Sequence, residues 1–443
     1  MSRDWLRRKL GVFDIYSLVH ADSQSTFYFI LGVIAAAAGQ YTFLVVLYGT
    51  ALMAAIALAY GEMGSRFPET GGSYLYVKTT LGRTAGFFSA WLLSFDQAVM
   101  VAYGSLDGTL YLSSMLSYYG IYIPYIIIRV LSFVIALSLA ILTFIGIKES
   151  ARVSAAVAIL DLVLIGVMTV LLGLILELKT APPYFAWSGV KAADIWAGLS
   201  YASRGYTGMD AIGQLAGEAE MPLIQVPRAT ILAASIGAAY GIGLTALLMN
   251  SVTYSVVASN PATAVVNIAA SLPYGTWLVF PVGVVTAVVQ IMAALAGFVA
   301  FSRLVYRLAE EGMLPKLFSR IHKKYRTPYV SIILSAAVAF AFLSPGEIYI
   351  IVDIYAVASL INYLMVSLSL LLEVRRGELY GALRTPTIRG ISLVGISGVV
   401  LTAIGLALSL IVRYQEVWVL ALWAAAGAAL LLASSKKGVG SVK

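Results

Sequence analysis

The chain has 443 residues, of which 60% are hydrophobic and only 11% are charged. Soluble domains carry roughly 25% charged residues, so this composition excludes a water-soluble fold. The formal net charge is +8, but the sequence has no compact polar domain on which a basic surface for nucleic acid could form. Because cysteine is absent, disulfide bonds and thiolate metal sites are excluded as well.

Apolar segments long enough to cross a membrane recur along almost the whole chain. A hydrocarbon core of roughly 30 Å needs about 20 apolar residues in a helix. Runs between charged clusters and Gly or Pro breaks predict about twelve spans. In chain order they cover residues 12–38, 41–65, 84–115, 125–147, 152–176, 193–217, 229–254, 275–303, 328–344, 347–372, 390–412 and 417–434. Residues 261–272 are too short to span and are predicted to form an external re-entrant or surface helix.

The distribution of basic residues predicts the orientation of the spans. If the spans alternate in direction, 24 of the 29 Lys and Arg residues fall on the side of the N-terminus, four fall on the other side, and Arg204 lies within a span. Loops rich in Lys and Arg stay in the cytoplasm. The opening MSRDWLRRKLG has no small-residue cleavage site after it, which predicts a retained terminus. We therefore expect a multi-pass protein of the plasma (cytoplasmic) membrane with both termini cytoplasmic.

Ionisable side chains inside spans are costly and usually face a bundle interior or a water-filled cavity. Those predicted at membrane depth are His20, Asp22, Asp96, Asp161, Arg204, Asp210 and Asp353. Two other polar residues have simpler expected roles. Glu62 should pair with Arg66 one turn later, and Gln290 should form a hydrogen bond to a neighbouring helix.

Two spans contain a polar interruption. Residues 20–26 in the first span are HADSQST, and residues 203–210 in the sixth are SRGYTGMD. Backbone groups freed by a helix break are tolerated at membrane depth only where they line a cavity. The two interruptions predict discontinuous helices, and their separation of five spans favours an inverted repeat. The alternative is a Ser- and Gly-rich kink packed against neighbouring helices.

Four longer motifs resemble one transporter superfamily. GEMGSRFPETGGSYLYVKTTLG at 61–82 looks like the end of its span 2 and its first cytoplasmic loop, and GIKESARVSAAVAIL at 146–160 looks like its entry to span 5. GMDAIGQLAGEAEMPLIQVPRAT at 208–230 resembles its span 6 and the loop that follows. The most specific match, SRLVYRLAEEGMLPKLFSRIHKKYRTPYVSI at 302–332, resembles its connector between spans 8 and 9. Over most of residues 8–332 the chain is thus similar to the amino acid/polyamine/organocation (APC) superfamily.

The resemblance implies an all-α polytopic fold of the LeuT type, with broken helices 1 and 6 holding the substrate between them. A single transmembrane domain, 1–443, would contain repeat one (12–176), an inverted repeat two (193–372) and extra helices (390–434). No cofactor and no metal are implied. Carried over to this sequence, the candidate substrate-binding residues are His20, Asp22, Ser23, Ser25, Thr26, Asp96, Gln97, Ser203, Arg204, Tyr206, Thr207, Gly208 and Asp210.

The first span departs from the pattern of the amino acid carriers. Where those usually have a glycine-rich break, residues 25–29 are STFYF, so the amide cradle for a carboxylate is missing. HADSQSTFY is closer to the potassium-importing branch, in which an aspartate at the Asp22 position resembles an ion ligand. TGMDAIGQ and FDQAV in spans 6 and 3 also resemble that branch. Yet its remaining oxygen ligands correspond here to Gln97, Met100 and Phe29.

The leading hypothesis is a secondary active transporter that imports an amino acid or a related amine by alternating access. The alternative is an importer of potassium or another monovalent cation. An enzyme is not expected, because the chain has two histidines, no cysteine, and neither an HExxH nor a GxSxG motif. A channel or receptor would not need interruptions at corresponding positions. The expected partners are a small polar solute, a coupling proton and the lipid bilayer.

Coupling is expected to use protons rather than sodium. The resemblance implies that a sodium site would use hydroxyl groups of span 8, and this chain has none between Gln290 and Ser302. Some proton-coupled relatives place a lysine in span 5 where this chain has Asp161. A buried carboxyl group at that position could bind and release a proton in each cycle. The alternative is a permanent ion pair with Arg204.

Arg204 and Asp22 are the subjects of two further hypotheses. A guanidinium in helix 6 could replace the missing amides as a bidentate clamp for a substrate carboxylate. It could instead neutralise Asp22 or Asp161. Asp22 in turn needs a positive partner, because a lone carboxylate at membrane depth is costly. That partner would be a substrate ammonium, a potassium ion or Arg204.

Overall fold

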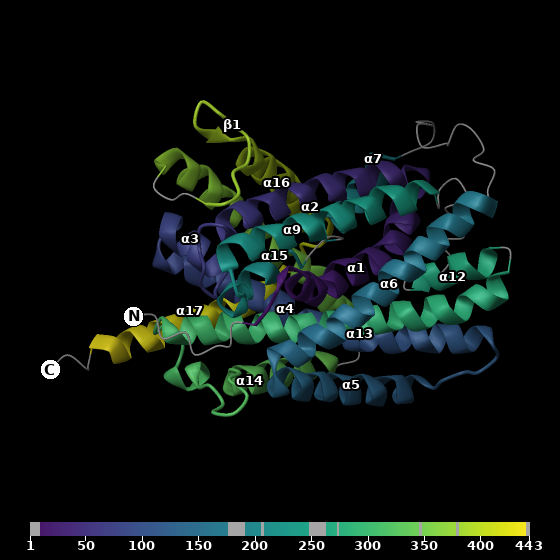
Figure 1. Cartoon of the computed structure of the whole chain (residues 1–443), viewed down its shortest axis with the longest axis horizontal. Helices are drawn as coiled ribbons and strands as arrows, with labels where there is room; N and C mark the ends of the chain where they lie inside the picture. Colours follow the sequence, from purple (N-terminus) through teal and green to yellow (C-terminus); the bar gives the residue numbers. More distant parts are fainter. Residues whose placement is uncertain are drawn as a thin grey trace.

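A computed structural model of the chain describes residues 9–175, 191–204, 208–247, 263–272, 274–344, 348–377 and 381–439. Within these ranges the side chains of Thr26, Phe29, Arg204, Asp353 and a few other residues lie outside the description. The long helices run roughly along the longest axis of the molecule (Figure 1). Nine of the described helices are long and apolar enough to cross a membrane. The predicted all-α, multi-span architecture is confirmed.

The helices follow the predicted spans closely. In chain order they are α1 (Val12–Ala38), α2 (Thr42–Gly64), α3 (Ser73–Leu81), α4 (Arg83–Tyr118), α5 (Tyr125–Ile145), α6 (Ile147–Ile175), α7 (Ala192–Arg204), α8 (Ala211–Gln214), α9 (Pro222–Ala238), α12 (Ala264–Ser271), α13 (Gly275–Glu310), α14 (Tyr329–Leu343), α15 (Ile348–Arg376), α16 (Leu393–Val412) and α17 (Val417–Val439). Strands β1 (Thr387–Ile388) and β2 (Ile391–Ser392) form a small antiparallel pair before α16. The short helix predicted within 261–272 is α12, whereas α13 continues well past its predicted end at 303.

The predicted break of the first span is wrong. α1 is one unbroken helix from Val12 to Ala38. Its polar run contains neither Gly nor Pro, the residues at which helices usually kink or break. Ser25 also finds a partner without opening the backbone. The Ser25 hydroxyl donates a hydrogen bond of 2.9 Å to the Asp22 carbonyl, a local bond that fits inside a helix.

The predicted break of the sixth span is present. α7 ends at Arg204, and α8, which is only four residues long, begins at Ala211. Of the residues between them, 208–210 are described and form a non-helical turn. Gly208 has a φ of +104°, a conformation that glycine adopts far more readily than other residues.

The contact between α4 and α13 is the most extensive helix pair in the described part of the chain. Gly104 and Gly108 of α4 and Gly297 of α13 make it possible. A Cβ atom at any of these positions would lie 2.6 to 2.8 Å from a carbonyl oxygen of the opposite helix. Small residues of this kind let helices approach closely in a membrane. On the other side of α13, the Gln290 amide donates to the Ser25 carbonyl of α1 at 3.1 Å, which confirms its predicted role between helices.

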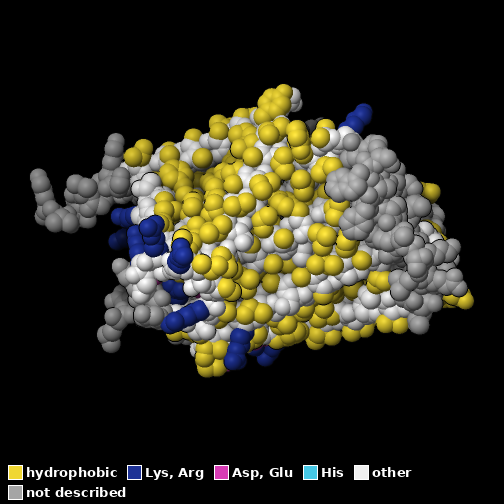
Figure 2. Space-filling view, turned by 90° about the horizontal axis from the view of Figure 1, so that it is seen from above, with side chains coloured by type: hydrophobic (Ala, Val, Ile, Leu, Met, Phe, Trp, Pro, Cys, Tyr) yellow, Lys and Arg dark blue, Asp and Glu magenta, His cyan; other side chains and the backbone are white. Residues whose placement is uncertain are grey.

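The surface has an apolar flank and one strongly basic end. Figure 2 shows apolar side chains over most of the visible flank and Lys and Arg gathered mainly at one end. The described chain starts and finishes at that same end, which we call the basic end (Figure 1). A flank of this composition is what a surface in contact with lipid tails requires. The expectation that the basic end faces the cytoplasm follows from the bias in Lys and Arg.

Candidate functional site

A buried group of carboxylates joins the turn before α8 to α4 and α15. Asp210, directly before α8, is fully buried. Its Oδ1 accepts a hydrogen bond of 2.8 Å from the Tyr363 hydroxyl, and its Oδ2 accepts one of 3.0 Å from Gln97 Nε2. The same Gln97 nitrogen donates to Asp96 Oδ2 at 3.1 Å. One amide group therefore holds two carboxylates from different spans close together.

Asp22 joins this group from α1. Its carboxyl group lies against Gly208, where an added Cβ atom would be 2.6 Å from Asp22 Cγ and 2.7 Å from Asp22 Oδ2. The first and sixth spans thus meet at a glycine whose missing side chain leaves room for the aspartate. Asp22, Asp96 and Asp210 are each at most 1% exposed. We call Asp22, Asp96, Gln97, Asp210 and Tyr363 the central cluster.

The chemistry of the central cluster suits a cation. The groups that donate to Asp210 are an amide and a phenol, and neither carries a positive charge. Buried carboxyl groups cost free energy unless they are protonated or compensated by a positive partner. An ammonium group or a monovalent cation fits this site better than an anion does.

A second buried group lies between α1 and α6, and we call it the histidine cluster. Asp161 Oδ2 lies 2.9 Å from His20 Nε2, and Asp161 Oδ1 accepts a hydrogen bond of 2.7 Å from the Tyr28 hydroxyl. The other ring nitrogen, His20 Nδ1, lies 2.7 Å from the Tyr16 hydroxyl. Both carboxylate oxygens of Asp161 are therefore engaged by α1. The alternative partner, Arg204, has its side chain outside the described residues.

The histidine cluster accommodates two protonation states without moving the backbone. When the ring is neutral, the Tyr16 hydroxyl can donate to Nδ1 while Nε2–H donates to Asp161. When the ring is protonated, both ring nitrogens donate and the Tyr16 hydroxyl accepts instead. A rotation of one hydroxyl is enough to pass from one arrangement to the other.

The remaining candidate residues fall into three groups. Ser23 and Ser25 are buried in α1, and Ser25 bonds along its own helix. Ser203 contacts its own helix and α2. Its hydroxyl donates to the Leu199 carbonyl at 2.8 Å and lies 3.2 Å from the Tyr48 hydroxyl of α2. Its place in the substrate site stays a prediction. Outside the described residues are Tyr206, Thr207 and the side chains of Thr26 and Arg204.

Sequence analysis missed the tyrosines of both clusters. Tyr363 donates to Asp210, and Tyr16 and Tyr28 belong to the histidine cluster. A usable signal existed for Tyr363, because Asn362 and Tyr363 form a polar pair inside an apolar run. Asn362 is itself buried and donates to the Ser89 hydroxyl at 2.8 Å. No comparable contrast marked Tyr16 and Tyr28, since the chain contains 27 tyrosines.

At the basic end, α13 is tied to the loop that follows the sixth span. Arg303 Nε and Nη2 donate to the two carboxylate oxygens of Glu218, each at 3.1 Å. Arg303 is 0% exposed and Glu218 1%, so this bidentate pair is fully buried. The Glu218 carbonyl also accepts hydrogen bonds from the backbone N–H groups of Lys9 and Leu10, at 2.9 and 3.0 Å. The N-terminal segment is thereby held in the same contact.

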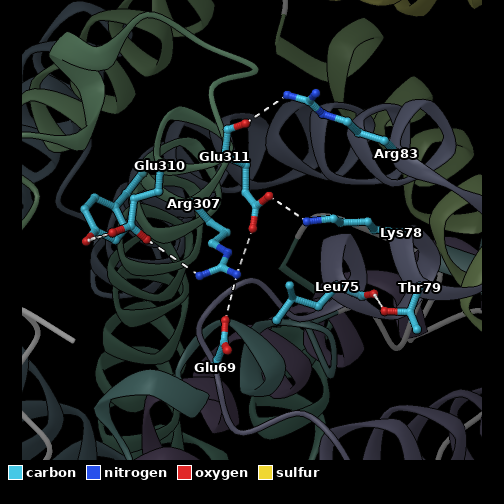
Figure 3. Close-up of polar contacts among 9 residues, drawn as sticks. Glu69, Leu75, Lys78, Thr79, Arg83, Arg307, Glu310 and Glu311 are labelled. Atoms are coloured by element: carbon cyan, nitrogen blue, oxygen red, sulfur yellow. Dashed lines mark hydrogen bonds and ion pairs between the residues drawn. The ribbon is translucent and has the colours of Figure 1, made fainter. Parts of the chain in front are cut away.

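One turn further along α13, Arg307 binds the loop that follows the second span (Figure 3). Its Nη2 donates to Glu69 Oε2 at 2.7 Å and to Glu311 Oε1 at 2.9 Å. Lys78 Nζ donates to Glu311 Oε2 at 2.6 Å, and Arg83 Nη2 donates to the Glu311 carbonyl at 2.9 Å. Partial burial acts to raise the pKa of Glu311, but the hydrogen bond from Lys78 and the charges of Arg307 and Lys78 outweigh it and hold that pKa below its usual range. We call Arg303, Glu218, Arg307 and Glu69 the α13 latch.

Known proteins are similar to this chain over most of its length. A family model for amino acid permeases matches residues 10–431. The branched-chain amino acid permease BcaP of Bacillus subtilis (strain 168) is 25% identical over 348 residues, which cover 74% of this chain and 72% of BcaP. The low-affinity putrescine importer PlaP of Escherichia coli (strain K12) is 25% identical over 332 residues, covering 71% and 69%. The potassium transporter KimA of Bacillus subtilis (strain 168) is 27% identical over 352 residues, covering 75% of this chain and 55% of KimA.

Proposed function

Because the chain belongs to the amino acid permease family, we propose that it is a secondary active transporter that imports an amino acid or a related amine, coupled to protons, by alternating access. The observation that carries this proposal is the central cluster, in which three buried aspartates gather and uncharged side chains donate to Asp210. A substrate ammonium would supply a positive charge and up to three hydrogen bonds there. Two similar proteins are named for solutes that carry amino groups, branched-chain amino acids and putrescine.

Potassium is the second candidate solute. It is favoured by the similarity to KimA and by the same carboxylates. A potassium ion that loses its hydration shell needs several oxygen ligands in its place. Met100 lies one turn after Asp96 and Gln97 on α4 and offers only a thioether, a weak acceptor. An amine therefore ranks ahead of potassium.

Substitution of Asp22 by asparagine tests the central cluster as the ligand site. The purified wild type is first screened for an increase in melting temperature with leucine, putrescine and potassium chloride, and the stabilising compound is then titrated into the variant. We expect an unchanged melting temperature without ligand and an affinity at least about thirtyfold lower, because a neutral amide cannot offset desolvation of a cation. Asp107→Asn is the matched control, since Asp107 is a buried aspartate outside the central cluster. A lower melting temperature with retained affinity would instead make Asp22 a structural partner.

The histidine cluster is the proposed proton site. Asp161 and His20 share a hydrogen bond that accommodates one more proton, and Tyr16 can adjust to it. We expect Asp161→Asn to flatten the pH dependence of uptake into proteoliposomes, because an amide cannot gain or lose that proton. Asp194→Asn, at the exposed start of α7, is the control and should behave as the wild type does. Uptake by Asp161→Asn that keeps the wild-type pH profile would exclude this role.

The α13 latch supports the alternating-access part of the proposal. In the proposed arrangement, repeat one (12–176) and repeat two (193–372) are inverted copies, and helices 390–434 are additions. The latch joins α13 to the loops that follow the second and sixth spans, with the N-terminal segment bound beside it. Opening a path from the central cluster to the basic end requires these loops to separate from α13. The latch is thus the proposed closure of this end.

A further inference from the structure

A pocket at the basic end is not used by the transport proposal. It has a volume of about 280 Å³ and lies where the α5–α6 junction meets the N-terminal segment and the loop before α14. Five basic side chains line it and one acidic side chain opposes them: Lys9, Lys148, Arg152, Lys324, Arg326 and Glu149. We call it the basic pocket.

One wall of the pocket is the loop before α14, which is held against the end of α5 by specific contacts. The Thr327 hydroxyl donates to the Phe144 carbonyl at the end of α5, at 2.9 Å. The rings of His322 and Tyr325 stack at 5.0 Å, and both contact the ring of Phe144, at 5.1 and 5.5 Å. These contacts hold the loop against α5. They therefore fix the position of the loop that carries Lys324 and Arg326.

Arg326 adopts an unusual backbone conformation within this wall. Its φ is +60°, which non-glycine residues rarely adopt. The Arg326 N–H donates to the His322 carbonyl at 2.9 Å, and the His322 N–H donates to the Thr327 carbonyl at 2.9 Å, so the turn is closed on both sides. A strained residue that its surroundings hold in place often marks a binding site. Here it brings a guanidinium to the pocket.

The described lining of the basic pocket holds more basic than acidic side chains. Lys148 forms an ion pair with Asp14 of α1. Of the other charged residues in the described lining, four are basic and one, Glu149, is acidic. Guanidinium groups bind phosphate oxygens through parallel hydrogen bonds, and lysine adds a compact charge. The complementary ligand is therefore a phosphate-bearing anion.

The surroundings of the pocket indicate where that phosphate comes from. Ile145 at its edge is 40% exposed, and Val153, next to Arg152 on α6, is 39% exposed. Further along the same two helices, Ile141 and Ile159 are each 53% exposed. These side chains form the apolar flank that acyl chains would contact. A headgroup phosphate in the pocket would thus have its tails beside α5 and α6.

We propose that the basic pocket binds the phosphodiester headgroup of an anionic phospholipid. Basic pockets at the edge of a helix bundle are suited to this ligand, since it combines a fixed negative charge with chains that remain in the bilayer. The bound lipid would connect the N-terminal segment, the α5–α6 junction and the loop before α14. Because the proposal depends only on the membrane location, it stands independently of which solute is carried.

The test uses the full chain, purified in neutral detergent and supplied with phosphatidylglycerol, phosphatidylcholine or inorganic phosphate. We expect phosphatidylglycerol to raise the melting temperature and to remain bound in native mass spectra, and the other two additives to do neither. The double variant Arg152→Gln/Arg326→Gln should bind phosphatidylglycerol about tenfold more weakly or worse. The single variant Arg152→Gln changes an exposed position on α6 and leaves the loop before α14 intact. It should show a smaller loss of phosphatidylglycerol binding, which misfolding of that loop cannot explain.

The matched control is Lys316→Gln/Arg320→Gln. It removes the same charge from exposed positions near the same end that do not line the pocket. We expect this control to bind phosphatidylglycerol as the wild type does. An equal loss in the control would show that bulk charge, rather than the pocket, attracts the lipid and would overturn the proposal. Stabilisation by inorganic phosphate equal to that by phosphatidylglycerol would make the pocket a site for a soluble anion and would overturn it as well.

Discussion

Replacing Glu218 with glutamine should lower the free energy of unfolding by about 3–5 kcal/mol, because it leaves the Arg303 guanidinium buried without its counter-charge. Arg303 is 0% exposed and donates two hydrogen bonds of 3.1 Å to the Glu218 carboxylate. The second carboxylate of the α13 latch does not replace that partner, since Glu69 binds Arg307 one turn away. The measurement is unfolding in mixed micelles, followed by tryptophan fluorescence.

The α13 latch contains its own control for this experiment. Glu69→Gln removes one carboxylate partner of Arg307, which keeps Glu311, and the Glu69 side chain is 45% exposed. Solvent screens a pair of that kind, so the expected loss is about 0–1 kcal/mol. The double variant Arg303→Met/Glu218→Leu should recover most of the stability lost in Glu218→Gln, because a buried ion pair replaced by apolar side chains is often close to neutral. If Glu218→Gln and Glu69→Gln lowered the free energy of unfolding by equal, small amounts, the buried Arg303–Glu218 pair would stabilise the fold no more than the exposed pair does.

Alanine at position 208 should reduce solute uptake to the background level. The new Cβ atom would lie 2.6 Å from Asp22 Cγ and 2.7 Å from Asp22 Oδ2, well inside contact distance. The φ of +104° adds a backbone cost of about 1–3 kcal/mol for any residue with a side chain. Asp22 or the turn before α8 must move, and either movement takes the central cluster apart. The measurement is uptake of leucine, putrescine and potassium into proteoliposomes that contain equal amounts of protein.

Gly120→Ala separates the contact with Asp22 from the backbone cost. Gly120 has a φ of +82°, and nothing lies within 4 Å of an added Cβ atom there. The two variants therefore have a similar backbone cost, but only the alanine at position 208 comes too close to Asp22. We expect Gly120→Ala to retain most of the wild-type uptake. If both variants transported equally well, the close approach of Asp22 and Gly208 would not matter for function.

The sequence determined which segments form long apolar helices. Span length follows from the thickness of the hydrocarbon core, and apolar composition follows from the absence of water within it, so both are properties of a contiguous segment. The first span was placed at 12–38 and α1 has those bounds. Side-chain pairs one turn apart could be predicted for the same reason, since they too depend on a contiguous segment. Glu62 and Arg66 form the predicted ion pair one turn apart.

Helix continuity depended on context that the sequence alone does not contain. Both polar interruptions predicted a break, yet only the one that contains glycine has it. In α1, Ser25 bonds within the helix and His20 bonds to α6, and the run has no Gly or Pro at which the backbone would break. In the sixth span, Gly208 adopts a backbone conformation that the helix cannot contain, and the absence of a side chain admits Asp22.

Only the tertiary structure decided which polar residues work together. His20 and Asp161 are 141 positions apart, and Tyr363 and Asp210 are 153 apart. Sequence analysis identified His20, Asp161 and Asp210 as costly at membrane depth, but it had no means of pairing them. Nor did the sequence predict that the Ser203 hydroxyl lies 3.2 Å from the Tyr48 hydroxyl of α2. The physical reason is that the energy of a buried polar group depends on its partner, and helix rotation and packing choose that partner among segments far apart in the chain.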